Sequence, residues 1–447
     1  MSTTPLPFQL PGVDSWADLL RPAGWTFGIQ VVGAGLGYSV HILIGRWMGA
    51  DVYGTYLLAM GWAFLLSRVS GLGLPTAVLR LVPEYDTNSE YGLLRGLLRG
   101  SRAMVFGAGV IASLGVTGLL VATPLFPNVP HAALLIGVWL TPLLALVGLE
   151  TEILRAQRRV VWAYAPPRVL RPLLLMAGMG VILTTPLPKT GALLLGLMGA
   201  LLGTTLVLQY VGTRHSLPPT VHSAPPAYAP KAWVRLAGPL FFTKGFLVLI
   251  GKTDIFVIGA LLNTEQVGLY GAALRTAHVI TFVGMALDSI ASSAVTRLHT
   301  QGELDALQRL VGRLAQFYFW PTLLLAGGMA VASPAILHLF GPGFVESRPE
   351  LLILMGGLLL HASTGCQEYL LTLTGHERAC AWIYGVAMVL NLILNLLGVL
   401  TMGTVGAALA TAGSMVFWNG CMYVLVRRQF GIDPTIFAPL RSTQSTQ

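Results

Sequence analysis

The sequence predicts an all-α polytopic membrane protein built from two homologous six-helix lobes. Three observations support this fold class. The 447-residue chain is 54% hydrophobic and only 10% charged, whereas about a quarter of the residues in a soluble protein are charged. Its apolar stretches recur along the whole length and are long enough to cross a ~30 Å hydrocarbon core. A pattern of residues also repeats at a constant offset.

The repeat relates positions that are 214 residues apart, without a gap. Gly54 and Tyr56 in the first copy match Gly268 and Tyr270 in the second. One such match means little in so apolar a chain, but matches that stay in register over about a hundred residues indicate a duplicated domain. We interpret these four residues as a structural motif at the same place in each copy.

About twelve transmembrane helices are expected between the charged and Pro/Gly-rich breaks of the chain. Each must be helical, because unpaired backbone groups are too costly in lipid. The expected spans lie at roughly 25–45, 54–79, 103–123, 132–150, 169–186, 191–212, 235–261, 268–294, 316–340, 351–373, 380–400 and 403–426.

Six helices per copy is an even number, so both copies enter the membrane from the same side. A pseudo-twofold axis along the membrane normal should therefore relate the two lobes. The expected domains are a cytoplasmic N-terminal segment (1–24), a first lobe (25–213), a cytoplasmic Pro/Ser-rich linker (214–232), a second lobe (233–428) and a cytoplasmic tail (429–447).

The distribution of positive charge predicts the orientation. With the N-terminus inside, 20 of the 27 Lys and Arg residues lie on the cytoplasmic side and three on the other. Such a bias over short loops places both termini in the cytoplasm, and it explains the net charge of +9 without a nucleic-acid partner. The three cysteines form no CxxC pair, so we expect no cofactor and no metal.

The segment at 45–85 contains a turn, a Gly-Leu-Gly and a charged ending, namely Gly49, Tyr53, Gly54, Tyr56, Gly71, Leu72, Gly73, Ala77, Arg80 and Glu84. With these residues it resembles the first helical hairpin of polysaccharide-type lipid-linked oligosaccharide flippases, which belong to the multidrug/oligosaccharidyl-lipid/polysaccharide exporter superfamily. The segment at 267–275 is similar to the same turn in the second half of these proteins. The resemblance implies a transporter, not an enzyme.

Charged side chains at bilayer depth are costly and mark ligand or ion pathways. Most of them lie in the second copy, and their counterparts 214 residues earlier are uncharged. The cations expected to bind substrate in a central cavity are Arg275, Lys244, Lys252 and Arg68. Arg binds phosphate oxygens through its planar fork, and Lys acts as a point charge. Such a cavity would attract the diphosphate of a lipid-linked sugar.

The acidic residues allow two interpretations. Asp254, Asp288 and His278 are candidates for charge pairing or ion coupling. In one interpretation, Asp254 with Arg275 and Lys244 with Asp288 are buried structural ion pairs. In the other, the surplus of positive charge faces a cavity, and His278 titrates during transport.

The function that the resemblance implies is translocation of a polyprenyl-diphosphate-linked oligosaccharide, or a related polysaccharide precursor, across the bacterial cytoplasmic membrane by alternating access. Its partners would be the lipid-linked glycan, membrane lipids, and a polysaccharide polymerase or glycosyltransferases. One alternative is a multidrug or organic-cation antiporter, which needs unpaired carboxylates. Another is a membrane glycosyltransferase or polysaccharide ligase, which needs a larger external loop than any expected here.

Overall fold

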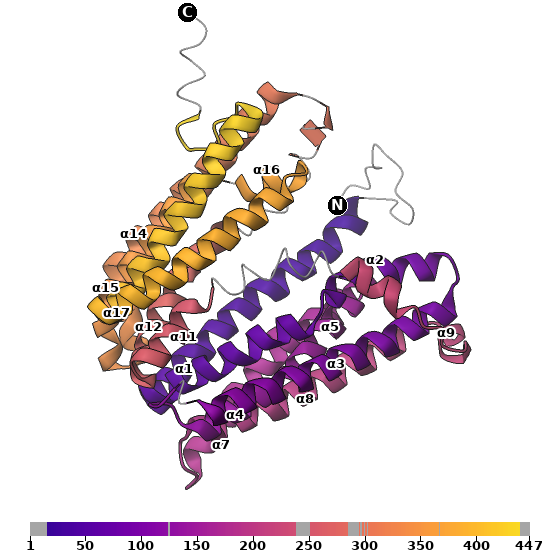
Figure 1. Ribbon diagram of the computed structural model, residues 1–447, viewed down its shortest axis with the longest axis horizontal. Coiled ribbons are helices and arrows are strands. Elements are labelled where there is room, and N and C mark those ends of the chain that lie inside the picture. Colours follow the sequence, from indigo (N-terminus) through magenta and orange to yellow (C-terminus); the bar gives the residue numbers. More distant parts are fainter. Residues whose placement is uncertain are drawn as a thin grey trace, which may run out of the picture. The chain divides into compact units, whose positions relative to one another are not determined.

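The structure is a computed structural model that describes residues 16–123, 126–237, 251–284, 303–365 and 367–438, with residues 295, 297, 298, 300 and 301. All regular structure in these ranges is helical (Figure 1). Seven helices within them are long and apolar enough to cross a membrane. The predicted all-α polytopic fold is confirmed, while the count of twelve spans and the lobe boundaries stay predictions.

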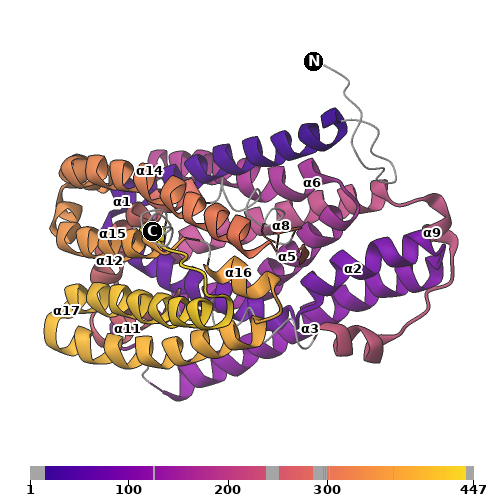
Figure 2. The ribbon, with the colours of Figure 1, turned by 90° about the horizontal axis from the view of Figure 1, so that it is seen from above.

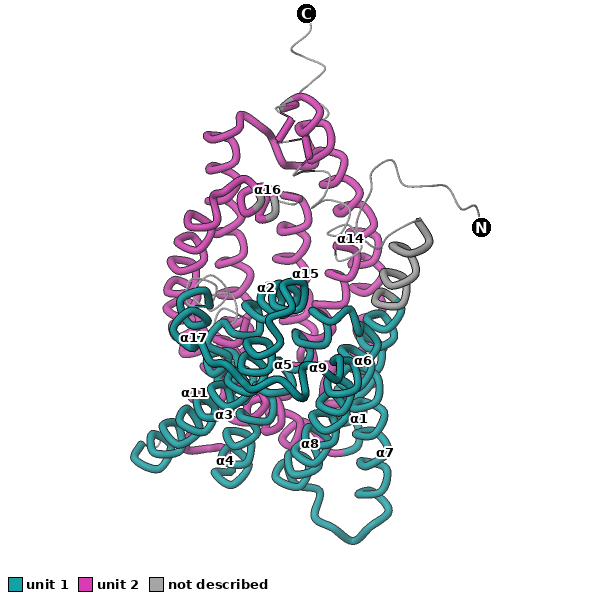
Figure 3. Tube along the Cα trace, turned by 90° about the vertical axis from the view of Figure 1, so that its right-hand side faces the viewer, with its two compact units in different colours: residues 1–47, 62–124, 130–241 teal, residues 48–61, 125–129, 242–447 magenta. Residues whose placement is uncertain are grey.

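The chain divides into two compact units, which Figure 3 shows in two colours. Unit 1 comprises residues 1–47, 62–124 and 130–241, and unit 2 comprises residues 48–61, 125–129 and 242–447. Two short pieces of the first copy therefore pack with the second.

Unit 1 is a helix bundle whose central member is α5. Helix α5 packs against α2, α3 and α8. The helices that begin in unit 1 are α1 (Trp16–Ser70), α2 (Leu74–Thr87), α3 (Tyr91–Ala122), α4 (His131–Trp139), α5 (Thr141–Ala156), α6 (Val160–Ala165), the π-helix η1 (Pro166–Leu170), α7 (Arg171–Thr184), α8 (Gly191–Ser216) and α9 (Pro219–Ser223).

Unit 2 is a second bundle, in which α15 packs against α14 and α17 (Figure 2). Its helices are α11 (Thr253–Leu261), α12 (Thr264–Ala277), the 3₁₀ helix η2 (His278–Thr281), α14 (Leu304–Phe340), the 3₁₀ helix η3 (Pro342–Ser347), α15 (Arg348–Ser363), α16 (Gln367–Leu373) and α17 (Glu377–Phe430).

Glycines set the breaks in the longest helices. Helix α1 contains a kink at Gly49, whose φ is 86°, and α17 contains one at Gly403, whose φ is 61°. These angles suit a residue without a Cβ atom. Helix α1 then ends before Gly73, whose φ is 73°. The span expected at 54–79 is therefore broken at the Gly-Leu-Gly segment.

The segment between the two copies packs onto unit 1 and is not a solvent-exposed linker. We call residues 217–237 the first strap. Its Val221 and Trp233 are both 1% exposed, in a core shared with α2, α3 and α5. The Arg95 guanidinium on α3 donates to the Ala224 carbonyl over 2.6 Å. A segment that is rich in Pro and Ser thus buries two large apolar side chains.

A second strap, residues 431–438, packs onto the second copy as the first strap packs onto unit 1. Residues 431–438 follow α17, and Ile432 among them is 2% exposed. Gln308 on α14 donates to the Asp433 carbonyl over 2.8 Å and accepts from the Asp433 N–H over 2.6 Å. Gln316 also donates to the strap. Both glutamines lie in the stretch of α14 that corresponds, 214 residues on, to the stretch of α3 beneath the first strap.

We expect Trp233→Ala to destabilise the protein by about 3–5 kcal/mol, because truncation of a fully buried tryptophan leaves a cavity. It also removes the donor to the Tyr85 hydroxyl, 3.2 Å away. Thermal unfolding of the purified protein in detergent measures the loss. Tyr228→Ala is the matched control, because Tyr228 lies in the same strap and is 56% exposed. Equal melting temperatures for the two variants would mean that the strap contributes no stability.

Candidate functional site

Four of the charged or titratable residues predicted from the sequence are neighbours in unit 2. Lys252 stands at the N-cap of α11 and Asp254 lies in the first turn of that helix. Arg275 lies in the last turn of α12, and His278 begins η2. Lys252 lies within electrostatic reach of both Asp254 and Arg275, and His278 within reach of all three. The site therefore combines two cations, one carboxylate and an imidazole.

Asp254 is paired with a tyrosine, and no ion pair joins it to Arg275, although the structure describes both residues. The Tyr270 hydroxyl donates to Oδ2 of Asp254 over 2.8 Å, and the Ile255 N–H donates to Oδ1 over 2.8 Å. Asp254 is 3% exposed and Tyr270 is fully buried. The predicted pairing of Asp254 with Arg275 is thus replaced by a carboxylate–tyrosine pair, because Tyr270 faces α11 from the adjacent helix.

The cations of the site are more accessible than its carboxylate. Lys252 and Arg275 are half-buried, and His278 is exposed. Nδ1 of His278 donates to the Leu274 carbonyl over 2.7 Å, which leaves Nε2 for another partner.

A second buried carboxylate, Glu350, escaped the sequence analysis. It lies in the first turn of α15 and is 5% exposed. The Thr404 hydroxyl donates to Oε1 over 2.6 Å, and Oε2 has no hydrogen-bond partner among the described residues. Tyr270 lies within electrostatic reach of both Glu350 and Asp254. Glu350 immediately precedes the apolar span expected at 351–373. It was therefore assigned to a loop and was not counted among the charges at bilayer depth.

Tyr270→Phe should lower stability by about 1–3 kcal/mol, because it leaves one oxygen of a buried carboxylate without its donor. Thermal unfolding of Tyr270→Phe, Asp254→Asn and the double variant forms a complete cycle. If Tyr270 and Asp254 interact, the double variant should lose less stability than the sum of the losses in the two single variants. Tyr423→Phe, on α17, is the control. Strict additivity would show that the hydroxyl and the carboxylate do not interact.

Of the three other predicted site residues, the structure describes only Arg68. Lys244 and Asp288 fall outside the described residues. Arg68 lies in unit 1, near the end of α1, where its guanidinium stacks on the Phe64 ring at 4.8 Å. Its acidic neighbour is Glu152.

The motif glycines bring two helix backbones into contact within unit 2. A Cβ atom on Gly54 would overlap the carbonyl of Thr264, and one on Gly268 would overlap the carbonyl of Ala50. Thr264 is the counterpart of Ala50 in the repeat, so the two contacts are reciprocal. The Thr264 hydroxyl also donates to Asp51. Reciprocal contacts of this kind are what a twofold relation between the two copies produces.

Unit 1 holds a buried ion pair that the sequence analysis also missed. Arg102 on α3 donates to both oxygens of Glu150 on α5, over 2.5 and 3.0 Å. Thr213 on α8 donates to the same carboxylate over 2.8 Å. Helix α3 begins at Tyr91, well before the span expected at 103–123, which is why Arg102 was assigned to a loop.

Comparison with known proteins identifies the family. Residues 19–295, more than half of the chain, match the family described as "Polysaccharide biosynthesis protein". Two relatives come from Haloferax volcanii. The probable low-salt glycan biosynthesis flippase Agl15 is 28% identical over 164 residues, 36% of this chain and 34% of Agl15. The probable flippase AglR is 22% identical over 418 residues, 89% of this chain and 81% of AglR. The chain thus matches about a third of Agl15 but most of AglR.

Solved structures of membrane transporters share the fold. The inward closed lipid II flippase MurJ has a TM-score of 0.71 at 14% identity and covers 90% of this chain and 87% of MurJ. An inward-facing multidrug resistance MATE transporter has a TM-score of 0.72 at 12% identity and covers 90% of this chain and 95% of that protein. The chain belongs to the polysaccharide biosynthesis protein family, and it is a multi-pass membrane protein with the fold of membrane transporters.

Proposed function

We propose that the protein moves a polyprenyl-diphosphate-linked oligosaccharide, or a related polysaccharide precursor, across the cytoplasmic membrane by alternating access. Family membership supports the substrate class, and the names of Agl15 and AglR as probable flippases support the translocation step. The cytoplasmic location of both termini and a bacterial host remain predictions, as do partner polymerases and glycosyltransferases.

The observation that carries the proposal is the surplus of positive charge around Asp254. Lys252 and Arg275 are two cations against one carboxylate, and Tyr270 already engages that carboxylate. The N-terminus of α11, at Lys252, adds partial positive charge from its backbone N–H groups. A diphosphate is a suitable ligand for such a group, because Arg275 can bind two of its oxygens at once.

The proposed cycle needs two states that bind the diphosphate differently. The cations attract the headgroup from one side, and rocking of one repeat against the other exposes it on the opposite side. The substrate can shift this equilibrium only by binding one state more tightly than the other. Changes in hydrogen bonding at Asp254 and His278 would supply part of that difference.

Transport in reconstituted vesicles tests the proposal. Vesicles with a fluorescent polyprenyl-diphosphate oligosaccharide in both leaflets are treated with an impermeant glycosidase. In empty vesicles about half of the label should be cleaved, and active protein should make nearly all of it accessible. Cleavage that stays at the level of empty vesicles, with correctly inserted protein, would refute the proposal.

A second candidate is export of organic cations. The buried carboxylates of Asp254 and Glu350 favour it, since Glu350 keeps one oxygen without a hydrogen-bond partner among the described residues. A deletion strain separates the two functions. Accumulation of lipid-linked sugar without a change in drug resistance supports the flippase, and the reverse result supports the antiporter.

A further inference from the structure

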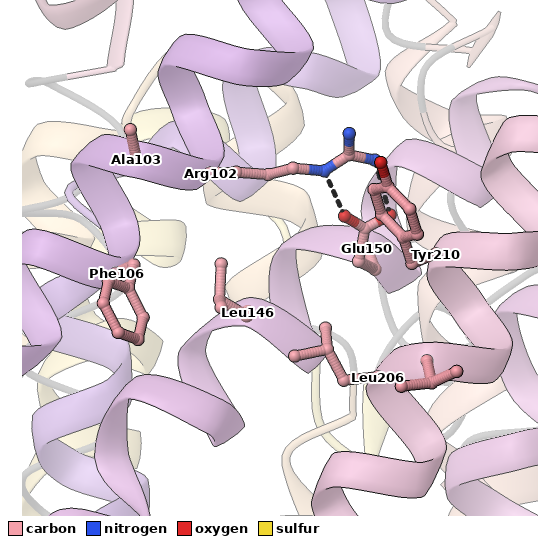
Figure 4. A pocket seen from close by; sticks show the side chains of 8 residues that line it. Arg102, Ala103, Phe106, Leu146, Glu150, Leu206 and Tyr210 are labelled. Atoms are coloured by element: carbon pink, nitrogen blue, oxygen red, sulfur yellow. Dashed lines mark hydrogen bonds and ion pairs between the residues drawn. The ribbon is translucent and has the colours of Figure 1, made fainter.

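Unit 1 contains an apolar cavity between α3, α5 and α8. Its volume is about 460 Å³. Figure 4 shows the carbon side chains of Phe106, Leu146 and Leu206 along it, with the Arg102–Glu150 ion pair at one end. A volume of this size falls in the range of small-molecule sites. The lining is almost wholly hydrocarbon, so the body of its occupant should be hydrocarbon as well.

The cavity adjoins a surface suited to contact with lipid. Phe106 is 48% exposed and Val207 is 61% exposed, although both are apolar. The exposed face of α3 continues with Ile111 and Leu114, which are 71% and 54% exposed. In a membrane protein such a face is covered by acyl chains, so a hydrocarbon chain can enter the cavity sideways from the bilayer.

The polar end of the cavity is cationic and firmly built. Arg102 stacks on the Tyr210 ring at 4.8 Å, and its side chain is 22% exposed. Glu150 occupies two of its three nitrogens, and Figure 4 shows the third pointing away from Glu150. Arg99 precedes Arg102 by three residues, and Arg214 follows Tyr210 by four. Both are exposed and lie on the helix faces that line the cavity.

The second copy does not repeat the residues of this ion pair. The counterparts of Arg102, Glu150 and Tyr210 are Gln316, Thr364 and Val424, so no ion pair can form at those positions. Gln316 is engaged by the second strap, where it donates to the Ile436 carbonyl over 3.3 Å. The Arg–Glu pair at the end of this cavity is therefore specific to the first copy at these positions.

We propose that this cavity holds one acyl chain of an anionic membrane phospholipid, with the lipid phosphate against Arg102, Arg99 and Arg214. The chain enters from the leaflet on the arginine-rich side. Basic pockets between transmembrane helices on that side suit anionic headgroups. The site is separate from the transport site in unit 2 and does not depend on the identity of the transported substrate.

Photocrosslinking of lipid to the full-length protein in nanodiscs tests the site. The probes are photoreactive phosphatidylglycerol and photoreactive phosphatidylcholine with the same acyl chain, and the labelled peptides are mapped by mass spectrometry. Labelling should fall on α3 and α8 around Phe106 and Val207. It should be roughly fivefold stronger for phosphatidylglycerol for each arginine that contributes.

Three variants sharpen the test. Val207→Trp fills the cavity and should abolish labelling by either lipid, whereas Val424→Trp, at an exposed valine of the second copy, should leave it unchanged. Arg99→Gln combined with Arg214→Gln should reduce the preference for phosphatidylglycerol to the roughly fivefold contribution of Arg102, while labelling remains. Equal labelling by the two lipids in the parent protein would overturn the proposal. So would displacement of phosphatidylglycerol by an equal mole fraction of polyprenyl phosphate, because the occupant would then be the carrier lipid.

Discussion

Gly268→Leu should stop transport in protein that still inserts into the membrane. A side chain at Gly268 meets the backbone of Ala50, and backbone cannot move aside as a flexible side chain can. Overpacking of this kind costs about 1–3 kcal/mol. It disfavours the arrangement in which Gly54 and Gly268 touch by roughly 5- to 100-fold relative to arrangements in which they separate.

Transport into vesicles measures the loss of activity in Gly268→Leu. Crosslinking measures whether the contact between the helices of Gly54 and Gly268 is lost. Asp51→Cys with Thr264→Cys should react with a short bifunctional thiol reagent in the parent, because the native side chains are hydrogen-bonded. The same pair should react much less when Gly268→Leu is added. Gly413→Leu is the control, since nothing lies within 4 Å of a Cβ atom at Gly413. Unchanged crosslinking and transport in Gly268→Leu would show that the contact is dispensable.

Arg275→Ala should abolish translocation of the labelled oligosaccharide. A charge-assisted hydrogen bond contributes about 1.5–3 kcal/mol, so binding of the diphosphate should weaken by roughly 10- to 100-fold. Arg275→Lys should recover part of the activity, because lysine keeps the charge but loses the planar fork.

The control for Arg275 is Arg378→Ala, which removes an exposed arginine at the start of α17. Size-exclusion profiles and insertion should match the parent for both variants. If Arg275→Ala transports at the rate of Arg378→Ala, Arg275 is not part of the substrate site, and the transported lipid could still be correct.

The scaffold was largely predictable, because membrane insertion and duplication both leave strong patterns in a sequence. Hydropathy predicts the helical fold, and the offset of 214 residues predicts that Gly54 and Gly268 occupy equivalent places. The first strap was not predicted. Its composition is that of a linker, and only the burial of Val221 and Trp233 shows that it is part of unit 1.

The sequence predicted which charged residues of unit 2 lie near one another better than it predicted which of them pair. Depth along the helices predicts that Asp254 and Arg275 lie at the same level, but it carries no information on which side chain faces which neighbour. Tyr270 was identified as a motif residue, and its role as the partner of Asp254 needed the packing of α12 on α11. Glu150 was missed because it is the last residue of the span expected at 132–150, where a charge is not at bilayer depth.

The two straps bear on how such a chain can arise. Each follows the last helix of its copy and folds back on the third span of that same copy, so each copy buries its own end. A half-length ancestor with this arrangement would already have had an ordered C-terminus on its own surface. After gene fusion, that terminus would connect the two copies. The packing that already held it on the first copy would then hold the connecting segment, without a new interface.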